Sequence, residues 1–307
     1  FKMLIDNDTK SILSQLNLPE LLFSLPHIFT QKKKGQSIES YYSKIMGRKN
    51  FENVFQPAFN AIICQEADAF PADMLLQKRD RRKDIIKQYT FKAGMQTATD
   101  AIASQPNIKI KTGLTVEKIS FDGKIFSVAT NGGTFEASNL ALASPVAVSA
   151  ELLRSSFPEV SGLLAKIRTA TVDSVGVAVK KEAVSLSPVS GLIPVNDIFY
   201  SVVSRDTVPH EHYRGFTFHF KPGSLTHKAK LERIARVLGL RVLQLEFIAE
   251  KENYIPSLRV GHTEIIANVD RLLAGKPLFI SGNYFRGVAI EDCVSRSLSE
   301  FQRLKNK

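Results

Sequence analysis

The sequence predicts an α/β fold with a helical beginning, a strand-rich middle and a closing helix–strand–helix unit. Three observations predict it. Residues 1–90 place apolar side chains at helical spacing. Residues 108–143 form short apolar runs separated by glycine-containing turns, and residues 265–304 return to a helical period around one short buried strand. A chain of 307 residues is long enough for two domains or one large domain.

Three helices are expected in the first part of the chain. Ser37 is a favourable N-cap for a helix that Gly47 would end. A second helix is expected over residues 51–64, which present a broad apolar face. A third helix would carry Met74 and the basic cluster at residues 78–83.

Short strands are expected next, with Asp-Gly at residues 122–123 and Asn-Gly-Gly at residues 131–133 as hairpin turns. Ser144 and Pro145 would open a helix, as its cap and its first residue. The expected strands are residues 108–111, 114–120, 125–130, 134–136 and 139–143.

Further strands are expected at residues 172–179, 198–203 and 216–220, before a helix over residues 224–238 that Gly239 would stop. A helix over residues 265–273 and a buried strand over residues 278–280 would follow. The last helix should carry its apolar residues on one stripe, namely Ile290, Val294, Leu298, Phe301 and Leu304.

The net charge of +11 favours anionic partners, such as acidic lipid or a carboxylate-bearing substrate. The basic clusters at residues 32–34 and 78–83 contain no interleaved aromatic residues, so nucleic acid is not an expected partner. Each cluster is interpreted first as a solvated helix end or loop, and second as a peripheral contact with an anionic membrane surface. No apolar run is long enough to span a membrane.

Cysteine usage favours a reducing compartment, which makes a cytoplasmic or membrane-associated location the expectation. The only cysteines, Cys64 and Cys293, are far apart in the chain and predict no disulfide framework. His210 and His212 form the only close histidine pair and lack further ligands at useful spacing, so no metal site is expected. No signal peptide is visible, and the first residue, Phe1, suggests that the chain begins within a longer protein.

The strongest functional signal is the segment LFISGNYFRGVAIEDC at residues 278–293. It combines a buried strand, a loop with two glycines and the start of a helix. Gly282 and Gly287 would let a ligand approach the backbone, and the helix start would offer free N–H groups to a flavin carbonyl or a pyrophosphate. An ordinary strand-to-helix loop is the alternative interpretation.

This segment resembles the C-terminal FAD motif of protoporphyrinogen oxidases, G-N-x-x-x-G-V-x-x-x-D-C. Upstream, YIPSLRVGH at residues 254–262 resembles that family's A-L-P-Q-Y-x-V-G-H. Three shorter segments also resemble the family in the right order: AGMQT at 93–97, LTVEKI at 114–119 and LASP at 142–145.

The resemblance to the protoporphyrinogen oxidase and flavin amine oxidase superfamily implies two domains. One is an FAD/NAD(P)-binding-type α/β domain, which would be incomplete here and would consist of residues 89–149 and 256–307. The other is a substrate domain with a mixed sheet and a helical part, formed by residues 1–88 and 150–255. The substrate cavity would lie at their interface.

The resemblance also implies roles for individual residues. Val116 would contact the adenine through its backbone. The loop and the last helix start would contact the flavin ring and the phosphates through Gly282, Asn283, Gly287, Val288 and Ala289.

Gly94 and Met95 would border the flavin or the substrate, although a Met at a helix start is often core filler. Arg259 and Arg286 would bind propionates if the substrate were a protoporphyrinogen, with solvent-facing arginines as the alternative. No catalytic residue is assigned, because the flavin performs the difficult step. His262 is expected to be a helix-cap side chain rather than a catalytic residue.

Several departures from the family pattern concern the cofactor. The family's N-terminal G-x-G-x-x-G turn, which brings the backbone to the pyrophosphate, occurs nowhere in this sequence. Ala93 replaces the first glycine of the family's G-G-M segment, and the sequence has no Trp. FAD binding by this chain alone is therefore expected to be incomplete.

The implied activity is hydride transfer from a substrate carbon to flavin N5, with oxygen or another acceptor taking the electrons. A protoporphyrinogen-oxidase-like enzyme of porphyrin and heme biosynthesis, acting on a tetrapyrrole, is the first hypothesis. An amine oxidase or a carotenoid desaturase of the same fold is the second. The third is a cofactor-free binding fragment that is inactive without its N-terminal part.

Overall fold

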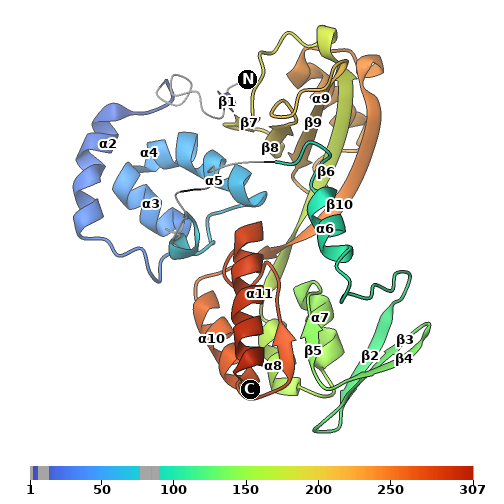
Figure 1. Ribbon diagram of the computed structural model, residues 1–307. Coiled ribbons are helices and arrows are strands. Elements are labelled where there is room, and N and C mark those ends of the chain that lie inside the picture. The colour runs from blue at the N-terminus through green and yellow to red at the C-terminus, as the bar shows by residue number, and fades with distance from the viewer. Residues whose placement is uncertain (1–2, 6–13, 77–83, 85–89, 307) are drawn as a thin grey trace. The chain divides into compact units, whose positions relative to one another are not determined.

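The computed structural model describes residues 3–5, 14–76, 84 and 90–306 (Figure 1). The chain divides into two compact units, each assembled from separated segments. Unit 1 contains Phe1–Leu75 and Ile167–Thr263, and unit 2 contains Leu76–Lys166 and Glu264–Lys307. The unit boundaries differ from the expected domain boundaries. Residues 150–166, which were expected in the substrate domain, belong to unit 2, and residues 256–263, which were expected in the FAD domain, belong to unit 1.

The first half of unit 1 is helical, as expected. Ser37 caps α3 by accepting a hydrogen bond from the N–H of Ser40, and α3 ends at Gly47. The helix expected over residues 51–64 is continuous but contains a π-helical turn, and it ends at Cys64 in a left-handed conformation (φ 50°). The elements are α2 (Leu18–Ser24), η1 (Leu25–Phe29), α3 (Ile38–Met46), α4 (Arg48–Asn50), η2 (Phe51–Phe55), α5 (Gln56–Ile63) and η3 (Ala72–Met74).

The expected third helix is not formed around Met74, which lies in the short 3-10 turn η3. The basic cluster at residues 78–83 lies outside the described residues.

The second half of unit 1 is a six-stranded antiparallel sheet with the order β1-β7-β8-β9-β6-β10. Three of these strands, β1, β7 and β10, were not predicted from the sequence; β10 is mostly polar and exposed, so it carries little strand signal. The strands are β1 (Met3–Ile5), β6 (Arg168–Lys180), β7 (Gly191–Pro194), β8 (Phe199–Ser204), β9 (Tyr213–Phe220) and β10 (Glu246–Ser257), and η4 (Lys181–Ala183) follows β6.

One face of this sheet packs against α9 (His227–Leu238) and forms the core of unit 1. Alternate residues of β6 and β9 supply it, including Val175 and Phe218, which are completely buried. The helix begins three residues later than expected because Thr226, not Ser224, accepts the capping hydrogen bond from Ala229. It ends at Gly239, as expected, and η5 (Val242–Gln244) follows.

Unit 2 contains a three-stranded antiparallel meander, β2 (Val116–Phe121), β3 (Phe126–Thr130) and β4 (Gly133–Ala137). Asp122 closes the first turn by accepting hydrogen bonds from the N–H groups of Lys124 and Ile125. The strand expected over residues 108–111 was wrong: these residues are exposed and irregular. They have no partner strand among the described residues, and without one their apolar alternation is not enough to form a strand.

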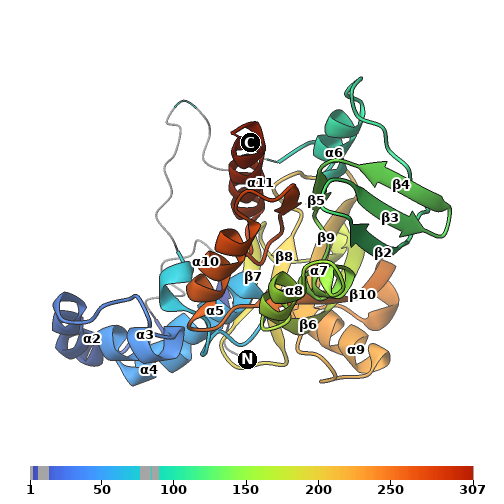
Figure 2. The ribbon, with the colours of Figure 1, turned by 90° about the horizontal axis from the view of Figure 1, so that it is seen from below.

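The rest of unit 2 is a short parallel sheet and the helices around it, which both ribbon views show (Figures 1 and 2). β5 (Leu140–Leu142) pairs in parallel with β11 (Leu278–Ile280). Pro145 is the N-cap of α7 rather than its first residue, and Ser144 makes no capping bond. The helices are α7 (Val146–Leu153), α8 (Pro158–Leu164), α10 (His262–Leu273), which begins at the end of unit 1, and α11 (Ile290–Lys305), with α6 (Gln96–Ala103) preceding the meander.

Candidate functional site

The loop at residues 281–289 begins at the carboxyl edge of the parallel sheet of unit 2. The N–H of Ser281 donates to the carbonyl of Leu142, so β5 and β11 end together (2.9 Å). Ligands of α/β folds bind at this edge, outside the carboxyl ends of parallel strands. The structure therefore brings Gly282, Asn283 and residues 286–289 into one loop at the edge where a cofactor is expected.

Neighbouring side chains explain why glycine occupies positions 282 and 287, and the sequence alone did not reveal these neighbours. A Cβ on Gly282 would lie 2.4 Å from a ring carbon of Tyr284, and one on Gly287 would lie 2.4 Å from a carboxylate oxygen of Asp292. Gly287 also has a φ of 157°, near the edge of the range that favours glycine. Both glycines are thus required by the loop's own side chains, with or without a ligand.

Tyr284 and Phe285 hold the loop against the rest of unit 2. Neither residue was predicted to do so from the sequence. Their side chains are 1% and 2% exposed. The Tyr284 hydroxyl lies 3.2 Å from that of Ser149 in α7, and burial raises the pKa of Tyr284. The guanidinium of Arg296 stacks 3.9 Å from the Phe285 ring centroid. Tyr284 therefore anchors the loop to α7, and Phe285 anchors it to α11.

The amino end of α11 faces this loop and is partly capped. Asp292 accepts a hydrogen bond from the N–H of Ala289 (3.1 Å), which is the N-cap residue. The next two N–H groups, of Ile290 and Glu291, make no hydrogen bond to any other described residue. Because Asp292 already supplies a negative charge, this end suits a neutral carbonyl acceptor better than a second anion.

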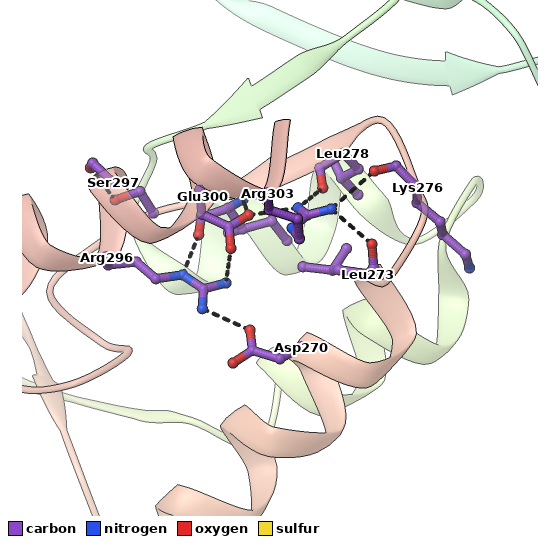
Figure 3. Close-up of polar contacts among 10 residues, drawn as sticks. Asp270, Leu273, Lys276, Leu278, Arg296, Ser297, Glu300 and Arg303 are labelled. Carbon is purple, nitrogen blue, oxygen red and sulfur yellow. Dashed lines mark hydrogen bonds and ion pairs between the residues drawn. The ribbon is translucent and has the colours of Figure 1, made fainter. Parts of the chain in front are cut away.

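One face of α11 is polar and buried, which reverses the usual arrangement (Figure 3). Arg296 donates to the carbonyl of Ile280 and pairs with Asp270 of α10 and with Glu300. Glu300 accepts from the N–H of Ile280, and Arg303 donates to the carbonyl of Leu278. These side chains take the place of a neighbouring strand and close the outer edge of β11.

The expected apolar stripe of α11 lies on the other face and is exposed. The exposed fractions run from 36% at Leu304 to 69% at Ile290. Phe301 and Leu304 line a groove of about 250 Å³ together with Ala141, Ala143 and Phe279 of the parallel sheet. The C-terminal end of the stripe thus forms one wall of an apolar groove beside β5.

The free edge of β5 lies at this groove. Backbone groups of Leu140 and Leu142 point towards β11, so the N–H and C=O of Ala141 point to the opposite edge. No strand of the described chain pairs with that edge, and Ala141 is exposed. The two-stranded sheet is therefore closed on the β11 side and open on the β5 side.

The other site residues expected in unit 2 lie on separate segments. Val116 is the first residue of β2 and is 39% exposed. Gly94 (φ 89°) and Met95 form an exposed turn before α6. Arg286 is exposed in the loop at residues 281–289. The backbone of Val116, Gly94 and Met95 is therefore accessible. A contact of these residues with a cofactor stays a prediction.

Arg259 lies in unit 1 and is exposed in the connection after β10. The N–H of His262 donates to the carbonyl of Arg259, and His262 is the buried first residue of α10. Its position at a helix start agrees with the structural role expected for it.

A row of polar side chains crosses the sheet of unit 1 on the face opposite α9. This row was not predicted from the sequence. Ser174 of β6 pairs in register with His219 of β9 and with Lys251 of β10. The amide of Asn253 donates to the Ser174 hydroxyl (3.0 Å), which lies 3.0 Å from Nδ1 of His219. Each residue alone is an ordinary polar residue in a strand; only the register brings them together.

The imidazole in this row is neutral. Burial lowers the pKa of His219, so the ring carries no charge at pH 7. Its Nδ1 shares a hydrogen bond with the Ser174 hydroxyl, and either group can be the donor. The row therefore places a neutral imidazole two strands away from Lys251.

The row continues to Ser201 of β8, which is paired in register with His219. The Cys64 thiol lies 3.9 Å from the Ser201 hydroxyl, and burial raises its pKa. Next to Ser201, burial and the charge of Glu66 raise the pKa of Tyr200 to about 12. The thiol and the phenol are thus both protonated at neutral pH.

The described residues contain no group of three His, Cys, Asp or Glu side chains arranged to hold a metal. The His210 ring instead accepts hydrogen bonds from the N–H groups of His212 and Tyr213, which gives it a role in a turn. Among the helices of the described chain, none is long and apolar enough to cross a membrane.

No family model matches the sequence, and no curated protein resembles it significantly. Solved structures do resemble it. A protein from Exiguobacterium sp. 255-15 with a provisional assignment as a protoporphyrinogen oxidase has a TM-score of 0.73 at 15% identity, over 94% of this chain and 72% of that chain. Putrescine oxidase bound to putrescine has a TM-score of 0.67 at 11% identity, over 98% and 77%.

A reduced UDP-galactopyranose mutase has a TM-score of 0.64 at 13% identity, over 88% of this chain and 67% of that chain. These likenesses extend over most of the sequence and include both units. The resemblance expected from the sequence motifs is thus confirmed at the level of the fold. This chain has the mixed α/β fold of FAD-dependent oxidoreductases of the protoporphyrinogen oxidase and amine oxidase type.

Proposed function

We propose that this chain is the larger part of an FAD-dependent oxidoreductase that transfers a hydride from a substrate carbon to flavin N5. The observation that carries the proposal is the loop at residues 281–289, which joins the carboxyl edge of the parallel sheet to the amino end of α11. Its motif and the fold of the whole chain point to the same class of enzyme.

The residues of this loop fit part of an FAD site. The free N–H groups of Ile290 and Glu291 would hold a carbonyl oxygen of the flavin ring, and Val288 and Ala289 would contact it. Bound FAD would accept the hydride and pass the electrons to oxygen or another acceptor. The loop's own contribution is a rigid, partly dry wall, which Tyr284 and Phe285 anchor.

The open edge of β5 would receive the missing part of the cofactor domain. A parallel sheet of two strands is unusual, because parallel sheets are normally covered and extended on both sides. A further parallel strand beside Ala141, followed by a helix against the exposed stripe of α11, would bury both features. The glycine-rich strand–turn–helix that these 307 residues lack has this form.

The polar row of unit 1 favours an acidic substrate over an amine. The Lys251 ammonium group is a cation on this face, so it suits a carboxylate and would repel an alkylammonium ion. A carboxylate-bearing tetrapyrrole, with Arg259 of the same unit as a further partner, is therefore our first substrate class. Amine oxidation is the second.

A single substitution tests the helix end without disturbing the helix. Ile290→Pro removes one free N–H, and proline is tolerated at the first helical residue. Ala289 already has the extended conformation that proline requires before it (φ −80°, ψ 153°). Ile290→Ala is the matched control, because it removes the side chain and keeps the N–H.

FAD would be titrated into both variants, and binding followed by quenching of flavin fluorescence. We expect Ile290→Pro to bind FAD about three- to tenfold more weakly than Ile290→Ala, as the loss of one hydrogen bond implies. Equal affinities at unchanged thermal stability would remove α11 from the cofactor site. If these 307 residues bind too little FAD to compare, as incomplete binding implies, the same pair of variants would be measured in the protein that carries a glycine-rich strand–turn–helix segment before Phe1.

A further inference from the structure

Unit 1 contains a cavity of about 440 Å³ at the end of its sheet where β6 finishes and β9 begins. Its floor includes Ala178 of β6 and Gly215 of β9, which are cross-strand partners with a small side chain or none. They share a sheet face with the polar row but lie about 13 Å further along, because Ala178 follows Ser174 by four residues. All the residues that line the cavity belong to unit 1 and none to the polar row, so it is a separate place for a small ligand.

A buried ion pair fixes one wall of the cavity. The Arg214 guanidinium donates to both carboxylate oxygens of Asp206 (3.0 and 2.6 Å), and the two side chains are 7% and 9% exposed. Arg214 also donates to the carbonyl of Leu186, and Asp206 accepts from the N–H of Val189 (3.1 Å). The pair therefore holds the segment before β7 in place, and a ligand would bind without having to order this wall.

Flat rings form another part of the lining. The Tyr213 ring packs against the ring of His210, with centroids 5.7 Å apart, and edge-on against that of Phe247 at 5.5 Å. Nδ1 of His210 accepts hydrogen bonds from the N–H groups of residues 212 and 213, which leaves the proton of the ring on Nε2. Pro188 and Pro209 add two more rings. A lining of this kind suits a planar, largely apolar molecule.

Two cations line the same cavity. Lys181 and Arg205 are exposed, and neither forms an ion pair with a carboxylate of the described residues. Arg205 lies close against the floor: its N–H donates to the carbonyl of Gly215 (2.9 Å), and a Cβ on Gly215 would lie 3.1 Å from its Cγ. Asp206, the one carboxylate among the described lining residues, is already paired with Arg214. The cavity therefore has a surplus of positive charge.

We propose that this cavity binds a small aromatic carboxylate. The aromatic ring would lie over Ala178 and Gly215 against the ring of Tyr213, and the carboxylate would pair with Lys181 and Arg205. An organic cation would be repelled by the same two side chains, and a compact inorganic anion would leave the apolar floor uncovered. The proposal does not depend on the proposed function, since no residue of the polar row or of the loop at 281–289 takes part.

Naphthoate is a suitable probe, and naphthylmethanol is its neutral counterpart with the same ring. Because the sequence has no Trp, the fluorescence anisotropy of the naphthalene ring can be followed against a weak protein signal. We expect the parent protein to bind naphthoate about tenfold or more tightly than naphthylmethanol, as one charge-assisted hydrogen bond implies.

Variants separate the charge of the cavity from the net charge of the protein. Lys181→Gln/Arg205→Gln should weaken naphthoate binding about tenfold and leave naphthylmethanol binding unchanged. Lys118→Gln/Lys124→Gln, which removes the same charge from exposed positions in unit 2, should bind both compounds like the parent protein. Circular dichroism should show that both double variants fold normally, because all four side chains are exposed.

Two further variants locate the ligand. Ala178→Leu adds side-chain volume at the floor and should weaken both compounds about tenfold or more. Lys251→Gln removes the cation of the polar row and should leave naphthoate binding unchanged. If Ala178→Leu does not fold, Lys251→Gln and the two double variants decide the outcome.

Four results would overturn the proposal. The first is no binding of naphthoate to the parent protein, and the second is equally tight binding of naphthylmethanol. The third is an equal loss of naphthoate binding in the two double variants, which would mean attraction by net charge alone. The fourth is a loss with Lys251→Gln that matches the loss with Lys181→Gln/Arg205→Gln, since the ligand would then occupy the polar row.

Discussion

The two sheets of this protein differ in how completely other parts of the same chain cover their faces and pair with their edges. The antiparallel sheet of unit 1 has six strands and buries a full apolar face against α9. The parallel sheet of unit 2 has two strands, an edge closed by side chains of α11 and an open edge at Ala141. The first sheet buries one face against a helix of its own unit, whereas the second leaves one backbone edge without a partner strand among the described residues.

The exposed apolar helices of the two units differ in the same sense. The stripe of α11 lies beside an open strand edge and an apolar groove, which suits a protein strand and helix. The apolar side chains of α2 and η1 are exposed as well, but neither element borders an open strand edge among the described residues. Exposure alone therefore does not identify a partner; the neighbouring backbone must also be considered.

The largest effect is expected from the core of unit 1. Phe218 is 0% exposed and Phe301 is 50% exposed, so Phe218→Ala should lower the free energy of unfolding by about 3–5 kcal/mol. Phe301→Ala should change it by about 0.5 kcal/mol or less. Urea denaturation followed by circular dichroism measures both. A large loss for Phe301→Ala would mean that the α11 stripe is already packed against something in this chain.

The closed edge of β11 should be nearly as sensitive. Arg296 is 3% exposed, and Arg296→Leu would leave Asp270 without its partner, Glu300 with only one of its two arginines, and the Ile280 carbonyl without its donor. We expect a loss of about 3–5 kcal/mol in thermal or urea unfolding. Arg271→Leu in the exposed part of α10 is the control and should have little effect. Similar values for the two would contradict the role of Arg296 as a substitute for a strand.

A smaller effect is expected from the loop glycine. Gly282→Ala places a Cβ against the Tyr284 ring and should cost about 1–3 kcal/mol. Gly162→Ala in α8 meets no atom within 4 Å, so it should be neutral or stabilise by up to about 1 kcal/mol. Differential scanning calorimetry of both variants decides the sign of each. A harmless Gly282→Ala would show that the loop is not fixed by Tyr284.

The smallest effect concerns pH. The pKa of His219 is lowered from 6.5 in the folded protein, so the unfolded chain binds a proton first as the pH falls. Stability should therefore decrease as the pH falls below about 6.5, until the folded-state pKa is reached. His219→Gln should reduce this slope. Urea unfolding at several pH values between about 5 and 7 tests it, and an unchanged slope would contradict a buried neutral imidazole.

Much of the secondary structure followed from local signals in the sequence. Ser37, Gly47 and Gly239 bound their helices where capping chemistry predicts, and the strand at residues 278–280 was located correctly. The order of motifs also led to the correct fold. These features depend on a few neighbouring residues, which is why periodicity and capping reveal them.

The rest depended on contacts between distant residues. The stripe of α11 was expected from its spacing, but its exposure arises because Arg296, Glu300 and Arg303 bind the backbone of β11 instead. The polar row depends on the register of three strands, and nothing in the sequence around His219 specifies it. The true neighbours of the loop glycines are likewise set by tertiary packing, as Gly282 and Tyr284 illustrate.

The most direct test of the central claim is the flavin content of two purified proteins. One is this chain of 307 residues, and the other carries a glycine-rich strand–turn–helix segment before Phe1. With that segment paired to β5, we predict nearly one FAD per chain by visible absorption, against little flavin in the shorter protein. A longer protein that is folded by circular dichroism yet colourless in the presence of FAD would contradict a flavin site at the loop of residues 281–289.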